Sequence, residues 1–272
     1  MDATAPDVVT LRDHLEGRSG PQRAPHALVI GATGYVGRHV VEGLRRDDIA
    51  TTAHVRPGSS RAGLAAGFEG DGAGVEHAAL EVEPLRDVMR SLAPTHVFLC
   101  HGTTAKRARA EGIEDPYETV DVGVTRIVVD AARGAEDPPR LVYLSSMGAG
   151  GRGAYLAARG KAEQLIRDSG LSFTLCRAPL ITGPDRDEGR PLERVGAALS
   201  GPTLRLLGAL GLRRLRGRYH PMDAREVAEG LIRSGFHHMT IDRVVLADEL
   251  RRLGVYELER WHPRSQRDAG RH

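Results

Sequence analysis

Three glycines spaced three residues apart, Gly31, Gly34 and Gly37, restrict the fold of this 272-residue chain more than any other feature. They follow the apolar run 27–30 and precede residues 35–46, in which apolar side chains recur at helical spacing. Glycines here permit a tight turn and bring backbone N–H groups to a helix N-terminus, where a pyrophosphate binds. The segment predicts a dinucleotide-binding turn whose contacts are Gly31, Thr33, Gly34, Tyr35, Val36 and Gly37.

The remaining chain alternates strand-like and helix-like segments. Strands are predicted at 51–55, 75–80, 96–100, 141–145, 173–177 and 244–246, and helices at 85–92, 117–132, 155–169 and 224–234. This alternation is typical of a parallel sheet covered by helices on both faces. We therefore expect an α/β fold, a doubly wound parallel Rossmann sheet with a small C-terminal substrate lobe.

The chain shows no repeats or long linkers, and its length allows a large core. We expect a single Rossmann domain over 25–262, with a Gly-, Pro- and Arg-rich substrate-side lobe mainly at 180–222. Residues 1–24 and 263–272 are expected to be flexible tails. The arginines of segment 205–218 form either a basic surface for a membrane or acidic partner or, as we favour, a solvated face over an apolar lobe.

Charge and cysteine content narrow the classes of partner. The 38 basic and 36 acidic residues nearly balance, which argues against nucleic acid as the main partner. Cys100 and Cys176 each lie in an apolar run and are read as reduced, buried thiols, so no metal site is expected. With no apolar signal-peptide core and no spanning segment, we expect a cytoplasmic protein without integral membrane association. Its partner is expected to be a small-molecule substrate, and a homodimer or an accessory role in a larger complex stays open.

The segment after the second predicted strand indicates which dinucleotide binds. An acid there accepts from the 2′-hydroxyl of NAD, whereas an arginine meets the 2′-phosphate of NADP. Residues 51–61 contain no acid but include Arg56, Ser59 and Arg61. This pattern favours NADP over NAD, although both arginines can also be read as solvated residues in a chain with only two lysines.

His101, Gly102 and Thr103 follow the fourth predicted strand, at the sheet edge where a dinucleotide crosses. A glycine there lets the backbone approach the cofactor ribose, so all three residues are predicted cofactor contacts. His101 is either a catalytic acid or, as we favour, a structural or solvated group.

Ser146 ends the fifth predicted strand, and Tyr155 begins the next predicted helix. Arg159 lies four residues after Tyr155 and shares its helix face. A fixed positive charge favours the phenolate and brings the tyrosine pKa down from about 10, as a general acid/base for a carbonyl/alcohol pair requires. The serine hydroxyl would orient the substrate oxygen. The alternative is a surface tyrosine and a capping serine pair.

Together the GxxGxxG turn, the serine pair and the Tyr-x-x-x-basic helix resemble the extended and atypical short-chain dehydrogenase/reductases, over about residues 26–235. Within them, the chain resembles the Tat-interacting-protein oxidoreductase group, an NADPH-binding branch, at CHGTT (100–104), AEG (110–112), the helix with Asp121, YLSSMGA (143–149) and GRP (189–191). This resemblance implies that Ser146 and Tyr155 are catalytic. It also implies that Arg177 and Pro179 border the nicotinamide pocket.

Two positions depart from that family. Arg159 stands where lysine is usual, and it keeps the charge but changes the shape, so ribose contacts are in question. Asp121 stands where many extended members have asparagine, although the Tat-interacting branch also carries an acid there. The sequence therefore predicts an NADP(H)-dependent oxidoreductase that acts on a small-molecule carbonyl or alcohol. A non-catalytic NADP(H)-binding regulator or accessory subunit, and an epimerase or dehydratase with retained cofactor, stay open as alternatives.

Overall fold

The computed structural model describes residues 23–59, 61–103, 108, 112–183 and 218–255. In these ranges seven parallel strands form one sheet in the order β3-β2-β1-β4-β5-β6-β9, which confirms the predicted doubly wound Rossmann sheet. The strands are β1 (His26–Ile30), β2 (Ala50–His54), β3 (Gly74–Glu76), β4 (His96–Leu99), β5 (Arg140–Ser146), β6 (Phe173–Ala178) and β9 (Arg243–Leu246).

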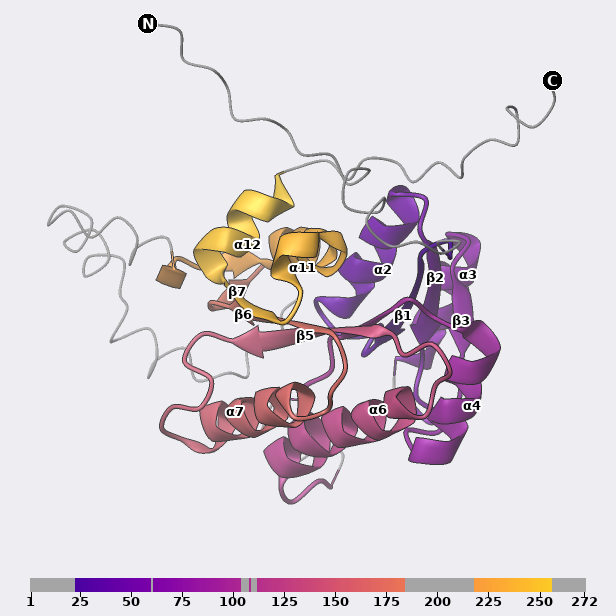
Figure 1. Ribbon diagram of the computed structural model, residues 1–272, viewed down its shortest axis with the longest axis horizontal. Helices are drawn as coiled ribbons and strands as arrows, with labels where there is room; N and C mark the ends of the chain where they lie inside the picture. Colours follow the sequence, from indigo (N-terminus) through magenta and orange to yellow (C-terminus); the bar gives the residue numbers. More distant parts are fainter. Residues whose placement is uncertain (1–22, 60, 104–107, 109–111, 184–217, 256–272) are drawn as a thin grey trace, which may run out of the picture.

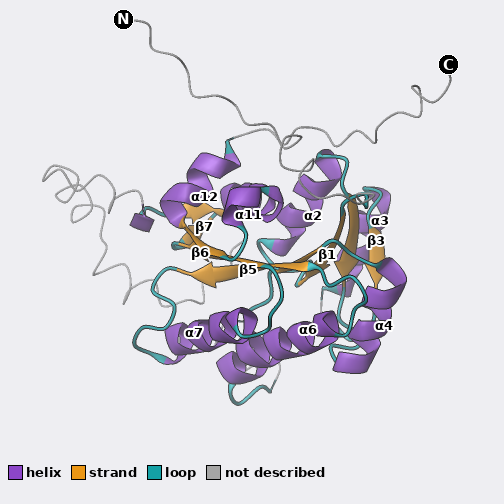
Figure 2. Cartoon of the chain, in the orientation of Figure 1, coloured by secondary structure: helices purple, strands orange, loops and turns teal. Residues whose placement is uncertain are grey.

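Helices cover both faces of the sheet (Figures 1 and 2). One face carries α2 (Gly37–Arg46), α11 (Ala224–Phe236) and α12 (Ala247–Gly254), and the other carries α4 (Val82–Leu92), α6 (Val124–Arg133) and α7 (Ala154–Arg167). Strand side chains alternate between the two cores: in β1, Val29 packs under the first set and Leu28 and Ile30 under the second. Apolar residues on both faces explain why these strands read as continuous apolar runs.

Strand β1 pairs with β2 on one side and with β4 on the other. The chain leaves β1 and β4 toward opposite halves of the sheet, and in open α/β sheets the carboxyl ends of the strands at such a reversal border the crevice in which ligands bind. The candidate site is built around that crevice.

Two predicted elements differ in the structure, and several short elements were not predicted. The expected helix 117–132 is divided into a π-helical turn, η2 (Tyr117–Gly123), and α6. The expected strand 75–80 is shorter, because β3 ends at Glu76. The prediction also missed the short helices α3 (Ala65–Gly70) and η1 (Ala62–Leu64), helix α12, the 3₁₀ turn η3 (His238–Thr240), and a two-stranded parallel sheet of β7 (Ile181–Thr182) and β8 (Met222–Asp223).

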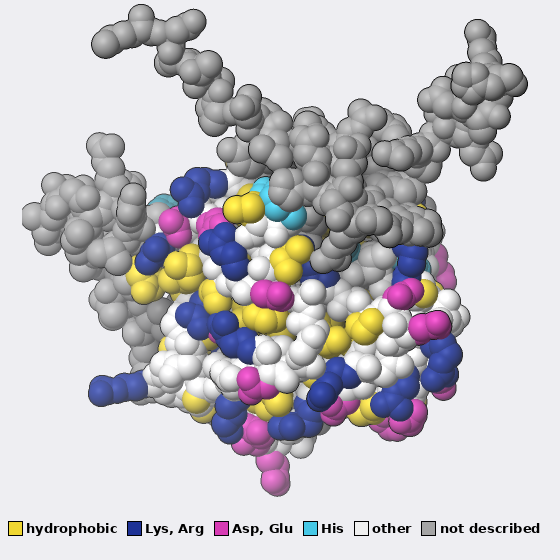
Figure 3. Space-filling model, viewed as in Figure 1, with side chains coloured by type: hydrophobic (Ala, Val, Ile, Leu, Met, Phe, Trp, Pro, Cys, Tyr) yellow, Lys and Arg dark blue, Asp and Glu magenta, His cyan; other side chains and the backbone are white. Residues whose placement is uncertain are grey.

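Basic and acidic side chains are interspersed on the visible part of the surface in Figure 3. No helix within the described ranges has the length and apolar character that crossing a bilayer requires. Most of the predicted substrate lobe, the arginines of 205–217, and nearly all of both predicted tails lie outside the described residues.

Candidate functional site

The glycine turn begins the site at the end of β1. Gly31 has a φ of +80°, and its carbonyl accepts a hydrogen bond from Gly34 N at 2.9 Å. A Cβ on Gly31 would lie 2.7 Å from His101 N, and one on Gly37 would lie 2.1 Å from Gly31 O. Side chains at either position would collide with backbone, so both glycines are required for the turn to form.

Helix α2 begins directly after this turn with no side chain capping its N-terminus and no acid in its first turn. Its orphan N–H groups and the positive end of its dipole therefore favour an anion. At Gly34, a Cβ would lie 2.9 Å from Gly31 O, so the turn leaves little room even for a methyl group. These features fit a pyrophosphate, the central group of a dinucleotide.

Three arginines lie in or beside the glycine turn and the loop after β2. Arg61 Nη1 donates to Thr33 O in the glycine turn at 3.2 Å, and its backbone N–H donates to Ser59 Oγ at 3.2 Å. Arg56 lies exposed in the turn after β2. Arg38 follows the last glycine of the turn, and its guanidinium carbon lies 5.4 Å from the Tyr35 ring centroid; no role was predicted for it from the sequence.

His101 and Thr103 are buried just past the end of β4. His101 Nε2 lies 3.0 Å from Thr125 Oγ1 and 3.3 Å from Asp121 O, whereas Nδ1 has no hydrogen-bond partner among the described residues. Burial, together with the nearby charge of Arg159, lowers the pKa of His101 to about 3. The ring is therefore neutral near pH 7 and lacks the second, acidic proton of an imidazolium, which disfavours a role as a catalytic acid.

The serine pair is divided between two environments. Ser145 Oγ donates to Glu163 Oε1 at 2.6 Å, and Arg177 holds the same carboxylate through Nε at 2.8 Å and Nη2 at 2.7 Å. Burial raises the pKa of Glu163, but these hydrogen bonds outweigh it and the net shift is downward. Ser146 at the end of β5 is half-buried, and its Oγ makes a 3.4 Å contact with Met147 O. Ser146 therefore carries the more accessible hydroxyl.

Arg159 lies at the centre of the site, 4% exposed. Its Nη1 donates to Tyr143 Oη at 2.8 Å and to Leu144 O at 2.9 Å, and its Nη2 lies 2.8 Å from Asp121 Oδ1. The guanidinium carbon is 5.4 Å from the ring centroid of Tyr155, so the two side chains meet on one face of α7. Arg159 Nε is buried with no hydrogen-bond partner among the described residues.

Gly102 joins this cluster to the glycine turn. A Cβ on Gly102 would lie 2.6 Å from Arg159 Nη2, so the chain after β4 packs directly against the guanidinium. Buried donors without partners, next to a backbone approach that only glycine allows, fit the ribose and nicotinamide end of a dinucleotide. Pro179 is buried after β6, and Arg177 is held by Glu163. The sequence analysis gave no role to Tyr117, Asp121 or Tyr143.

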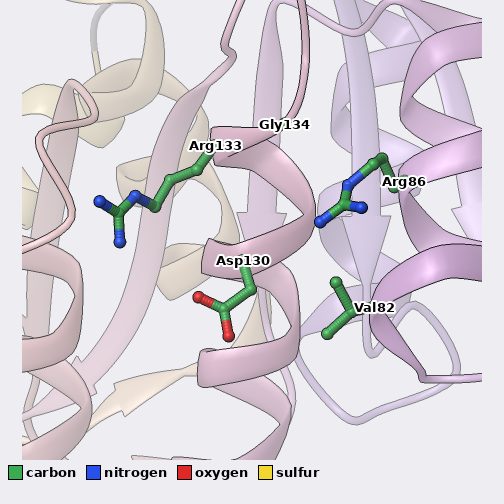
Figure 4. A pocket seen from close by; sticks show the side chains of 5 residues that line it. All are labelled: Val82, Arg86, Asp130, Arg133 and Gly134. Atoms are coloured by element: carbon green, nitrogen blue, oxygen red, sulfur yellow. The ribbon is translucent and has the colours of Figure 1, made fainter.

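A hollow of about 500 Å³ lies elsewhere, between α4 and α6, and is shown in Figure 4. In this view Arg86 points toward the helix that carries Asp130, whereas Arg133 extends from that helix to the side away from Arg86, so the two guanidinium groups do not converge on one ligand position. Within the described ranges, no group of three His, Cys, Asp or Glu side chains is arranged to hold a metal ion.

The turn, the uncapped helix and the crevice together define a dinucleotide-binding Rossmann protein. Residues 31–203 match the family described as NAD(P)H-binding, and the chain belongs to that family. The match begins at the first glycine of the turn. The cofactor is therefore a nicotinamide dinucleotide, with the choice between NAD and NADP left to the residues after β2.

Two fungal proteins are similar to this chain in sequence. Protein fmp52-1, mitochondrial, of Aspergillus terreus is 28% identical over 64% of this chain and 73% of its own length. Protein fmp52, mitochondrial, of Aspergillus fumigatus is 29% identical over 65% of this chain and 74% of its own.

Solved structures share the fold at low identity. UDP-glucuronic acid 4-epimerase from Bacillus cereus, in complex with NAD, has a TM-score of 0.59 at 13% identity over 81% of this chain and 76% of its own. AtPrR2 with NADP⁺ and (+)pinoresinol has a TM-score of 0.60 at 16% identity over 82% of this chain and 70% of its own. A short-chain dehydrogenase/reductase superfamily protein from Agrobacterium tumefaciens with bound NAD has a TM-score of 0.55 at 17% identity over 81% and 76%. The fold is that of short-chain dehydrogenase/reductases and epimerases.

Proposed function

We propose that this protein is an NADP(H)-dependent oxidoreductase of the short-chain dehydrogenase/reductase type, acting on the carbonyl or alcohol of a small molecule. The observation that carries the proposal is Tyr155 against the Arg159 guanidinium, 5.4 Å from ring centroid to guanidinium carbon, beside Gly102 at the carboxyl edge of the sheet. Bound NADP(H) supplies the hydride chemistry. The resemblance to the Tat-interacting-protein oxidoreductase group is part of this proposal.

Each site residue then has a distinct task. Tyr155 holds or releases a proton at its hydroxyl, and Ser146 orients the substrate oxygen with the more accessible hydroxyl of the pair. Arg159 supplies positive charge beneath the tyrosine. The glycine turn and the N-terminus of α2 hold the pyrophosphate, while His101, Gly102, Thr103 and Pro179 border the crevice.

NADP rather than NAD is supported by the arginines after β2. Arg61 donates to the carbonyl of Thr33, and Arg56 lies exposed in the preceding turn with Ser59 between them. A guanidinium binds a phosphate through parallel charge-assisted hydrogen bonds. Residues 51–61 offer no carboxylate to a ribose 2′-hydroxyl.

The proposal includes a single domain over 25–262, with the lobe at 180–222 choosing the substrate, and a cytoplasmic location. Both fungal relatives carry mitochondrial names, so fractionation of a tagged protein is the test of location. Size-exclusion chromatography tests the homodimer and the accessory role.

A second candidate is a non-catalytic NADP(H)-binding regulator. It is favoured by the Asp121 carboxylate, which lies 2.8 Å from Arg159 and offsets the charge on which proton transfer depends. Turnover across a panel of aldehydes, ketones and alcohols with NADPH or NADP⁺ decides between the two. Binding of NADPH without turnover identifies the regulator, and purification with tightly held nucleotide identifies an epimerase or dehydratase.

A further inference from the structure

The π-helical turn η2 lies along the start of α7, and two contacts four residues apart connect them. The ring centroids of Tyr117 and Tyr155 are 5.6 Å apart, and the Asp121 carboxylate lies 2.8 Å from Arg159 Nη2. π-Helical turns are rare and are found frequently at functional sites. We infer that Asp121 is a positioning residue that fixes Arg159 beneath Tyr155 and, by offsetting its charge, sets the proton affinity of the Tyr155 hydroxyl.

Contacts with Asp121 and Gly102 restrict the position of the Arg159 guanidinium. Asp121 is fully buried, its backbone carbonyl accepts from Thr125 Oγ1 at 2.6 Å, and Gly102 packs against the same Nη2 atom that meets the carboxylate. A guanidinium that is paired with a buried carboxylate and packed against backbone has little freedom to move toward the charge of a ligand. The charge that Tyr155 meets is therefore set by the protein.

Among the described residues, Asp121 is the acidic and Arg159 the basic member of this cluster. Burial raises the pKa of Tyr143, which bonds Arg159 from β5, and that of Cys100, which follows β4, each to about 12. Burial lowers the pKa of His101 to about 3. The phenol ring of Tyr117 from η2 also lies beside Tyr155. A pair of opposite charges beside the phenol favours the phenolate less than a lone arginine does.

This inference rests on the proposed function for its catalytic meaning, but its test does not need turnover. The phenolate of Tyr155 is measured by ultraviolet absorbance as the difference between each protein and the same protein carrying Tyr155→Phe, in the full chain with and without NADPH. Asp121→Asn removes the negative charge and keeps a side chain of nearly the same size, with an oxygen in place of Oδ1. Its matched control is Glu118→Gln on the same turn, whose exposed carboxylate pairs with Lys161.

Asp121→Asn is expected to lower the midpoint of the Tyr155 titration by on the order of one pH unit, because an uncompensated positive charge favours the phenolate. Glu118→Gln is expected to leave the midpoint unchanged. An unchanged or raised midpoint in Asp121→Asn, or an equal shift in both variants, overturns the inference.

A buried guanidinium without its carboxylate can prevent folding. Asp121→Asn combined with Arg159→Lys keeps one positive charge but has fewer donors to satisfy, and it too must titrate below the parent protein. Where a substrate turns over, the pH profile of kcat must move in the same direction. A shifted Tyr155 titration without turnover in the parent protein supports the role of Asp121 and rejects hydride transfer. Turnover with an unshifted Tyr155 titration supports hydride transfer and rejects the role of Asp121.

Discussion

Two buried arginines bind the two ends of β5 in opposite ways. Arg140, at the first residue of the strand, donates to neutral oxygens within the described part of the chain: Thr174 Oγ1, Thr240 Oγ1 and the carbonyls of Ser234 and His237. Arg159 binds near the other end, where it meets Tyr143, the carbonyl of Leu144 and a full carboxylate, Asp121.

The difference separates the amino edge of the sheet, where Arg140 has a structural role, from the carboxyl edge, where Arg159 lies beside the residues proposed for catalysis. The carbonyls that Arg140 binds belong to the C-terminal end of α11, where the helix dipole favours a cation, and burial lowers the pKa of Arg140 to about 10. Its hydrogen bonds join β5, β6 and α11. Arg159 instead faces the Tyr155 ring and keeps an unpartnered Nε. The amino edge should therefore govern stability, and the carboxyl edge activity.

Tyr155→Phe should give the largest effect. If this variant keeps its turnover, the assignment of activity to the carboxyl edge is wrong. The change removes one hydroxyl at the carboxyl edge, so turnover should fall by about 10²–10⁴-fold, the usual contribution of general acid/base catalysis. The free energy of unfolding and the affinity for NADPH should stay near those of the parent. Steady-state kinetics, denaturant unfolding and nucleotide titration measure the three quantities. Retained turnover would remove Tyr155 from the mechanism.

Arg140→Met tests the amino edge. It removes the buried donor shared by the hydroxyls of Thr174 and Thr240 and by two helix-end carbonyls, which keep their bonds from Thr240, so the free energy of unfolding should fall by about 3 kcal/mol. NADPH affinity of the folded protein should not change. Denaturant unfolding measures the loss, with Arg90→Met on the exposed face of α4 as control. A loss no greater than that of the control contradicts the structural role of Arg140.

The sequence predicted most of the fold because the apolar pattern of β1, β4, β5 and β6 reports burial on both faces of the sheet. It failed where a long-range contact decides the local structure. Residues 117–132 have a helical pattern, and nothing within them shows that the first turn is a π-helix placed against α7. Helix α12 was missed because eight residues carry too few turns to show a period.

The candidate site was predictable in its residue types but not in its charge balance. The four-residue spacing predicted that Tyr155 and Arg159 share one helix face, and the Arg159 guanidinium does lie against the Tyr155 ring. Spacing could not show that Asp121, 38 positions before Arg159, reaches the same guanidinium. Nor could it show that Ser145 is held by Glu163, which leaves Ser146 the more accessible hydroxyl.

The two ends of β4 also allow a pH test of stability, because a half-buried histidine, His96, begins the strand and a buried one, His101, follows its end. Burial, with a nearby arginine, lowers the pKa of His96 and of His101 to about 3. The unfolded chain, with an ordinary histidine pKa of 6.5, binds protons that the folded protein excludes, so this stability is present above pH 6.5 and is lost as pH falls toward 3.

Between pH 7 and pH 5 each ring should cost the folded state about 2 kcal/mol, from the linkage relation. Denaturant unfolding at several pH values measures the slope, and His96→Asn and His101→Asn should each flatten it by a similar amount. The exposed His77→Asn is the control, since it leaves both buried rings in place. A slope that neither buried variant changes would mean that other groups carry the acid sensitivity.

The smallest expected effect lies at the adenosine end of the carboxyl edge, where the proposed cofactor choice depends on single arginines. NADPH should bind more tightly than NADH by about 1–3 kcal/mol, the usual value of hydrogen bonds to a charged group. Arg56→Ala and Arg61→Ala should each remove part of that difference, by about 1 kcal/mol, and leave NADH affinity nearly unchanged.

Arg61 also donates to the glycine turn, so its loss can disturb both nucleotides, whereas Arg56 should act on NADPH alone. Fluorescence or calorimetric titration with both nucleotides separates the two effects, and Arg90→Ala controls for the loss of one surface charge. The preference should also weaken as salt is raised, because an exposed guanidinium and a phosphate attract each other through screened charge. Equal affinities for NADPH and NADH in the parent protein would refute the 2′-phosphate assignment. The proposed pyrophosphate turn and the proposed roles of Tyr155 and Arg159 would not be affected, because they concern parts that the two dinucleotides share.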